Sequence, residues 1–331
     1  MPGEAVNDAG NNDGPPFVVD EPAEPASSGR LELGGELRPL VAIDASQVKT
    51  GTTVEGVLAV VRAVAYEQGA TGKRIHIFKP GLCYIGNANA VEVMHTIGRA
   101  FGDPEHYVRV KDGVPVAEKG FSHSHQQRAD RVRNVVERAV QFYATGLIRR
   151  GLIVLDGAAT TDTFDTPPEV MESLAAATNA RGSHLIAVSK KTRLLVGGRE
   201  LRHALKGFPE GPFYRYLNPI LREERIKAAE QGGPRMRREP LGHLYAVRFG
   251  FAGETYRMDV VPAPGYGPDE ALASFYASTL FRAGYPEALI RAHLHAFVSY
   301  PDLIGLQAAA VAHFGFSLRR ELNLTPAFAP F

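Results

Sequence analysis

Cysteine is almost absent from this sequence of 331 residues, in which Cys83 stands alone. A single thiol excludes an intramolecular disulfide and a zinc site built from several cysteines, and it suits a reducing compartment. Long hydrophobic runs are also missing, because no stretch approaches the roughly 18 to 20 apolar residues of a membrane-spanning helix. The N-terminus lacks a basic region followed by an apolar one. We therefore expect a cytoplasmic protein with no membrane partner.

A strong excess of charge is absent as well, since 37 Lys and Arg residues stand against 36 Asp and Glu residues. A polyanion such as DNA would therefore have to bind a local basic patch. The phosphate-binding motif G-x-x-x-x-G-K-[ST] is also missing from the sequence. If ATP drives the work of this protein, another protein must supply the motor.

Basic residues are lacking from the first 29 positions, which carry six acidic side chains among Gly, Pro, Asn and Ser. Such a segment cannot bury enough apolar surface to fold by itself. We expect residues 1–34 to form a disordered acidic tail and residues 35–331 to form a single large domain. The tail is most simply a solvated leader, and shielding a basic surface or binding a partner are the alternatives.

Hydrophobic patterns in the remaining chain predict strands and helices in mixed order. Predicted strands cover residues 40–43, 151–155, 183–188, 245–251 and 255–261, and a hairpin is favoured for residues 54–66 and 74–78. Predicted helices cover residues 88–101, 126–143, 167–181, 269–282 and 286–296. This order indicates an α/β or α+β domain around one central sheet.

Two of the predicted buried strands are followed directly by an aspartate, Asp44 and Asp156. Glu137 lies on the helix predicted between them. Carboxylates that meet above a sheet edge bind hard divalent cations, and two such ions can activate water and cleave a phosphodiester. An aspartate after a strand is equally common as a helix cap or loop residue, so the pattern alone leaves both interpretations open.

Four segments in this order resemble the NurA nucleases: LVAIDAS (40–46), the helix that carries Glu137, GLIVLDG (151–157) and GYPEALIRAH (284–293). Glu137 precedes Asp156 by 19 residues and Tyr285 precedes His293 by eight, which is similar to the family's spacing. The resemblance implies an RNase H-like central mixed sheet flanked by helices. It also implies Mn²⁺- or Mg²⁺-dependent cleavage of DNA ends or single strands with two ions, a homodimer, and a HerA-type hexameric ATPase translocase as partner.

The resemblance also assigns site residues. Asp44, Glu137 and Asp156 would hold the metal, His293 would ligate it or position water, and Tyr285 would hydrogen-bond a phosphate oxygen. Lys190 matches a family lysine and would neutralise a phosphate, with Lys191 as the competing candidate and a pair of solvated lysines as the alternative. Apart from the resemblance, Asp259 near the end of a predicted strand is a candidate fourth carboxylate. It ranks below Asp44, Glu137 and Asp156, because aspartates at strand edges are common. Without the family, a lone histidine on a helix is more often structural, and His295 serves as its control.

The densest basic stretch predicts a DNA-binding surface. Arginines contact phosphates, and tyrosines stack on unpaired bases. The residues concerned are Tyr214, Tyr216, Arg222, Arg225, Arg235, Arg237 and Arg238. A charged helix on a solvated face and a dimer contact are the alternatives.

Rival functions lack residues that their chemistry requires. Sugar-kinase and actin-like ATPases place more glycines after the first acidic strand than residues 44–52 contain. Haloacid-dehalogenase-type phosphatases need a second aspartate where Ala158 stands. The alternative from another class is a non-catalytic scaffold of NurA-like fold that docks on a hexameric ATPase and gates DNA. The five matched side chains favour the nuclease, because a scaffold would be free to lose them.

Overall fold

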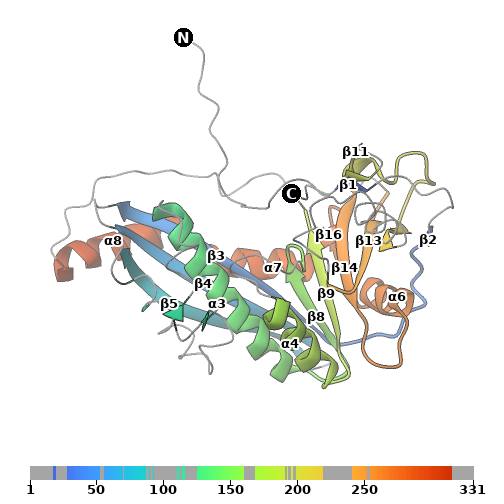
Figure 1. The fold of residues 1–331 in the computed structure, drawn as a ribbon, viewed down its shortest axis with the longest axis horizontal. Coiled ribbons are helices and arrows are strands. Elements are labelled where there is room, and N and C mark those ends of the chain that lie inside the picture. Colours follow the sequence, from blue (N-terminus) through green and yellow to red (C-terminus); the bar gives the residue numbers. More distant parts are fainter. Residues whose placement is uncertain are drawn as a thin grey trace, which may run out of the picture.

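A mixed nine-stranded sheet forms the centre of the part of the chain that the structure describes (Figure 1). The structure is a computed structural model, and it describes residues 18–19, 28–52, 56–69, 71–86, 89, 92, 110–111, 114–115, 125–159, 168–190, 192, 195–196, 199–218, 241–251 and 254–314. In spatial order the strands are β2 (Ser28–Arg30), β12 (Phe213–Tyr216), β13 (His243–Arg248), β14 (Tyr256–Val261), β9 (His184–Ser189), β8 (Leu152–Asp156), β3 (Leu40–Thr52), β4 (Gly56–Gly69) and β5 (Gly72–Gly86). The predicted α/β class, with a central mixed sheet flanked by helices, is confirmed.

The sheet is parallel at its centre and antiparallel on both sides. β8 pairs in parallel with β3 and with β9, while the other neighbours run antiparallel. Shorter strands pair outside the sheet: β1 (Val18–Val19) with β10 (Leu195–Val196) and β11 (Arg199–Glu200), β6 (Val110–Lys111) with β7 (Val114–Pro115), and β15 (Phe281–Arg282) with β16 (Tyr285–Pro286). β1 and β2 both lie within residues 1–34, which we predicted to form the tail.

Helices cover both faces of the sheet. Those described are α3 (His125–Leu147), α4 (Pro168–Asn179), α6 (Pro268–Ser278), α7 (Glu287–Ala296) and α8 (Tyr300–Phe314), together with the 3-10 turn η2 (Leu201–His203). Figure 1 shows α3 running along the long strands β3, β4 and β5. Within the described residues, no helix is both long and apolar enough to cross a membrane.

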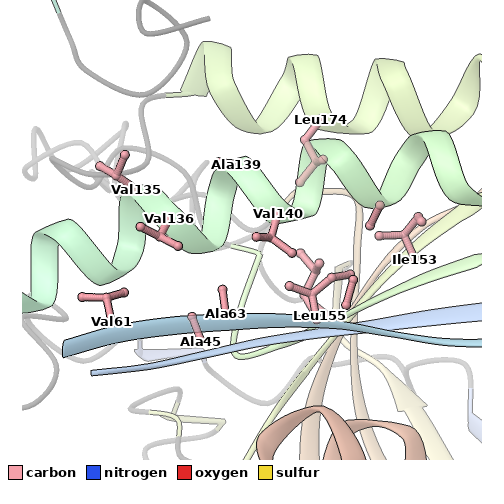
Figure 2. Close-up of a cluster of buried hydrophobic side chains, with 14 of the residues drawn as sticks. Ala45, Val61, Ala63, Val135, Val136, Ala139, Val140, Ile153, Leu155 and Leu174 are labelled. Atoms are coloured by element: carbon pink, nitrogen blue, oxygen red, sulfur yellow. The ribbon is translucent and has the colours of Figure 1, made fainter. Parts of the chain in front are cut away.

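The core on one face is packed beneath α3 and α4 (Figure 2). Apolar residues of α3 recur every three or four positions, so Val132, Val136 and Val140 point to the same side. They meet Ile43 of β3 and Leu155 of β8. Burial on both faces explains why LIVL in β8 is continuously apolar, as is typical of a central parallel strand.

The core on the opposite face is covered by α6 and α7. Leu40 and Ala42 of β3 point to this side and pack with Leu289 of α7 and Phe275 of α6. Side chains alternate between the two faces along each strand, so Asp44 shares the face of Leu40 and Ala42. By the same alternation Asp156 shares the face of Leu152 and Val154.

Most predicted elements are confirmed within a few residues, and three differ. The strand predicted for residues 74–78 extends over Gly72–Gly86, because β4 pairs with it along this length. The helix predicted to reach Arg282 ends at Ser278, because the chain turns there into β15. The strand predicted to stop before Asp44 continues to Thr52, because β4 pairs with it along this whole length. Most of the helix predicted for residues 88–101 lies outside the described residues.

Candidate active site

Asp44 and Asp156 lie opposite each other at the point where the parallel pairing of β3 and β8 ends. The last paired residues are Ile43 and Leu155, and Asp156 is the final residue of β8. Asp44 was predicted to end its strand, which is wrong, because β3 continues beyond it along β4. The two aspartates are nevertheless neighbours, because they follow the last parallel pair in register. Among the described residues, no strand pairs with this edge of β3 from Asp44 onward.

Two side chains from the C-terminal part of the chain reach these aspartates. His293 of α7 places Nδ1 2.8 Å from Asp44 Oδ2, and the Tyr285 hydroxyl donates to Asp156 Oδ1 at 3.0 Å. Tyr285 stands in β16, directly before α7, and its ring is buried against Tyr256. Residues 129 and 249 positions away in sequence are therefore brought to one place.

Lys190 completes this group at the end of β9. Its Nζ lies 3.6 Å from Asp156 Oδ2 and 4.2 Å from the centre of the Tyr285 ring. About a third of its side chain is exposed, so the ammonium group lies between the buried carboxylate and solvent. Lys191, its predicted competitor, lies outside the described residues.

Glu137 approaches from the other side of the sheet, on α3. It is buried, and its Oε2 lies 3.0 Å from an arginine one helical turn earlier, Arg133. Arg133 Nε also donates to the backbone oxygen of Ala45 at 2.8 Å, which ties α3 to the uncovered edge of β3 beside Asp44. We did not predict Arg133 as a site residue, although its position four residues before Glu137 could have indicated it.

Burial and mutual repulsion shift the titration of these groups. Burial raises the pKa of Glu137. The charges of Asp44 and Asp156 raise it further, and the charge of Arg133 acts to lower it. Burial also raises the pKa of Asp156, and so does Asp44, whereas Lys190 and Tyr285 act to lower it. The hydrogen bond to Asp44 raises the pKa of His293. The three carboxylates thus interact electrostatically although they come from both faces of the sheet.

The donor set suits a hard divalent cation in its chemistry, because oxygen ligands from carboxylates are those that Mg²⁺ and Mn²⁺ prefer. Each carboxylate oxygen already has a donor: Ala45 N–H and His293 for Asp44, Tyr285 and Lys190 for Asp156, and Gln141 and Arg133 for Glu137. Consistent with this, the described residues contain no group of three or more His, Cys, Asp or Glu side chains gathered as a metal site. A cation that binds these carboxylate oxygens would have to displace the hydrogen-bond donors or share the oxygens with them.

The loop after Asp156 is held in place by backbone geometry. Gly157 has φ of +110°, a conformation that other residues rarely adopt, and its N–H donates to Val188 O at 2.9 Å. Asp259 accepts the N–H of Ala159 at 2.9 Å and is paired with Arg257 at 3.0 Å. Asp259, considered above as a fourth carboxylate, is therefore engaged in holding this loop to β14.

The two described residues of the predicted DNA-binding set, Tyr214 and Tyr216, lie away from the carboxylates. Tyr214 and Tyr216 lie on β12, four strands from β8, which corresponds to about 19 Å. Tyr216 shares a hydrogen bond of 2.8 Å with His243, and Tyr214 contacts the edge of Tyr245. The five predicted arginines, Arg222, Arg225, Arg235, Arg237 and Arg238, lie outside the described residues.

Comparison with known proteins finds similarity among solved structures alone. No protein-family model and no curated protein matches the chain. The chain is similar to the NurA nuclease from Sulfolobus solfataricus, with 12% identity and a TM-score of 0.48 over 88% of this chain and 89% of that one. A structure of NurA bound to dAMP and manganese gives 12% identity and a TM-score of 0.41 over 88% and 90%. TM-scores below 0.5 do not decide function, which must be argued from the site itself.

Proposed function

We propose that this protein is a metal-dependent DNA nuclease whose active site contains Asp44, Glu137, Asp156, Tyr285, His293 and Lys190. One observation carries the proposal. The segments that resemble NurA nucleases are separated by up to 249 residues, yet Asp44 meets His293 and Asp156 meets Tyr285 through direct hydrogen bonds. If these residues were only helix caps or core residues, their carboxylates, imidazole, phenol and ammonium groups would not be expected to meet at one place.

The residues have complementary chemical roles in this proposal. Asp44, Glu137 and Asp156 would hold Mn²⁺ or Mg²⁺, with His293 as a further ligand. Such an ion, when bound, supplies a water of lowered pKa and neutralises charge on a phosphate. Lys190 stands at the solvent side of Asp156, where an ammonium attracts the phosphodiester. Tyr285 orients Asp156 through its hydroxyl, and His293 orients Asp44 through Nδ1.

The remaining parts of the proposal come from the family resemblance. They are two bound ions, digestion of DNA ends and single strands, a homodimer, and work with a HerA-type translocase in DNA repair or defence. The missing phosphate-binding motif supports a separate ATPase as the motor. Sedimentation of the protein with and without a HerA-type ATPase measures both the dimer and the partnership.

The experiment that tests the activity compares wild type with Asp156→Asn on labelled linear single- and double-stranded DNA. We expect wild type to cleave DNA with Mn²⁺ or Mg²⁺ and to lose cleavage in EDTA. Asp156→Asn keeps the shape of the side chain and removes its charge, so cleavage should fall at least about a hundredfold while DNA binding persists. Equal loss of binding would count against the assignment of Asp156.

One observation favours the alternative of a non-catalytic scaffold, namely that every carboxylate oxygen of the site already has a donor. The same assay separates the two functions. A scaffold binds the ATPase or DNA and leaves labelled DNA intact with either metal, also when the ATPase is present. That result would overturn the nuclease.

A further inference from the structure

Arg133 lies between Glu137 and the edge of β3 and is held there by three contacts. Its Nε donates to Ala45 O at 2.8 Å, and its terminal nitrogen lies 3.0 Å from Glu137 Oε2. The second terminal nitrogen donates weakly to Asn134 at 3.3 Å. A guanidinium has five N–H donors in a rigid plane, so these three contacts fix its orientation without using all of them.

The position of Arg133 follows from the topology of the sheet. Because β8 ends at Asp156, no strand among the described residues pairs with the edge of β3 beyond Asp44, and Arg133 reaches the Ala45 carbonyl at this edge. The guanidinium therefore occupies the direction in which β8 would have continued. Its positive charge faces Glu137, Asp44, Asp156 and Asp130.

A DNA phosphate that approaches this site meets negative charge. Three carboxylates repel a phosphodiester. The described cationic side chains that contact them directly are Lys190 at Asp156 and Arg133 at Glu137, and Arg138 also acts on Glu137 electrostatically. Lys190 and Arg133 contact different carboxylates on opposite faces of the sheet. About a third of the Arg133 side chain is exposed, so the side chain is partly open to solvent.

We propose that Arg133 is a substrate-binding residue of this site, which donates hydrogen bonds to a non-bridging oxygen of a DNA phosphate while its Nε remains on Ala45. The proposal rests on the proposed function, because it concerns the same DNA substrate. Arginine suits this role, since its fork of donors matches two phosphate oxygens.

The test measures binding of a fluorescein-labelled single-stranded oligonucleotide in EDTA, so that no metal and no cleavage contribute. Loss of a hydrogen bond between charged groups should weaken binding about tenfold in Arg133→Gln. Removal of one phosphate contact should also flatten the plot of log K against log salt concentration by about 0.7. Arg133→Lys keeps the positive charge, so its plot of log K against log salt concentration should have the slope of wild type. Arg291→Gln is the matched control, because Arg291 also pairs with a glutamate four residues away on one helix.

Arg133→Gln leaves the buried Glu137 carboxylate without its partner and can destabilise the protein. A second pair of variants avoids this effect. Glu137→Gln alone retains Arg133, whereas Glu137→Gln with Arg133→Gln loses both charges of the pair. We expect the double variant to bind about tenfold more weakly than Glu137→Gln and to show the flatter salt dependence. Equal affinities and equal slopes within this pair would overturn the role of Arg133 even if Arg133→Gln by itself did not fold.

The outcomes separate this proposal from the proposed function. Wild type that cleaves DNA while Arg133→Gln binds DNA like Arg291→Gln refutes the role of Arg133 and leaves the nuclease standing. Wild type that binds DNA through Arg133 but never cleaves it with Mn²⁺ or Mg²⁺ refutes the nuclease and supports Arg133. Wild type that neither binds nor cleaves DNA refutes both.

Discussion

At the scale of single residues, the polar groups of the site are placed by their hydrogen-bond partners as much as by the backbone. The Tyr285 ring is buried, yet its hydroxyl reaches the only carboxylate of β8. His293 is about two-fifths exposed, and its contact with Asp44 orients the ring. Each of these side chains can therefore be altered at one atom with little loss of packing.

Tyr285→Phe removes the hydroxyl that donates to Asp156 and keeps the ring against Tyr256 and Lys190. We expect kcat for DNA cleavage to fall about ten- to hundredfold, because a hydrogen bond to a charged group is lost. The free energy of unfolding should change by less than about 1.5 kcal/mol. Tyr300→Phe, at an exposed tyrosine of α8, is the control and should cleave like wild type.

His293→Ala should reduce cleavage strongly, whereas His295→Ala, two positions later on the same helix, should not. The expected difference follows from the contact of His293 with Asp44, which orients that carboxylate. Initial rates on labelled DNA at saturating Mn²⁺ measure it. Similar losses in both variants would show that α7 as a whole, and not His293, supports the activity.

Protonation of His184 should make the stability of the protein depend on pH. Burial, with Arg38 nearby, lowers its pKa to about 4, and its Nδ1 accepts the N–H of Ala263 at 2.8 Å. The imidazole of His184 becomes protonated below about pH 6.5 in the unfolded state and only below about pH 4 in the folded state. The free energy of unfolding should therefore decrease as the pH falls from about 6.5 to about 4. The difference between the two pKa values corresponds to about 3 kcal/mol at most.

Urea unfolding at several pH values between 4 and 7 measures this dependence. His184→Asn offers an oxygen to Ala263 and does not titrate, so its stability should fall less than that of wild type as the pH decreases. Parallel curves for the two proteins would contradict the assignment. Carboxylates contribute equally to both proteins and therefore cancel in the comparison.

At the scale of elements, the site depends on where strands end. β8 stops at Asp156, β3 continues to Thr52, and the uncovered edge between them admits Arg133 from α3. The loop after β8 is tied to β14 by Asp259, whose partner Arg257 is buried beside it. This pair therefore supports the end of β8 without belonging to the active site.

Asp259→Ala should destabilise the protein by about 3 to 5 kcal/mol, because it leaves the buried charge of Arg257 unpaired. Asp259→Leu combined with Arg257→Met removes both charges and should recover most of this loss. Denaturant unfolding measures both variants. If the double variant folds well but cleaves DNA far more slowly than wild type, the link from Asp259 through Ala159 positions Asp156.

At the scale of the whole molecule, the two cores share the same strands. Alternate residues of β3, β8 and β9 point into the core beneath α3 and into the core beneath α7. Neither core can lose its packing while the other keeps these strands in place. Differential scanning calorimetry should therefore show one transition, with equal calorimetric and van't Hoff enthalpies. Two separate transitions would show that the chain contains two independent domains.

The sequence by itself predicted most of the elements and several residues of the proposed site. Continuous apolar runs identified the central strands, and the three- and four-residue spacing identified α3. The end of β8 at Asp156 was predictable because a glycine and a polar loop follow it, whereas the strand end predicted at Asp44 was wrong. The family spacings selected Glu137, Tyr285 and His293 from many similar side chains.

Only the tertiary structure decided how these residues meet. Local patterns do not state how far a strand pairs, so the extension of β3 beyond Asp44 depended on β4. They also do not state which face of the sheet a helix covers, so the approach of Glu137 and Arg133 from the side opposite α7 could not be predicted. Contacts over more than a hundred residues, such as Tyr285 with Asp156 and His293 with Asp44, arise from packing of the whole chain.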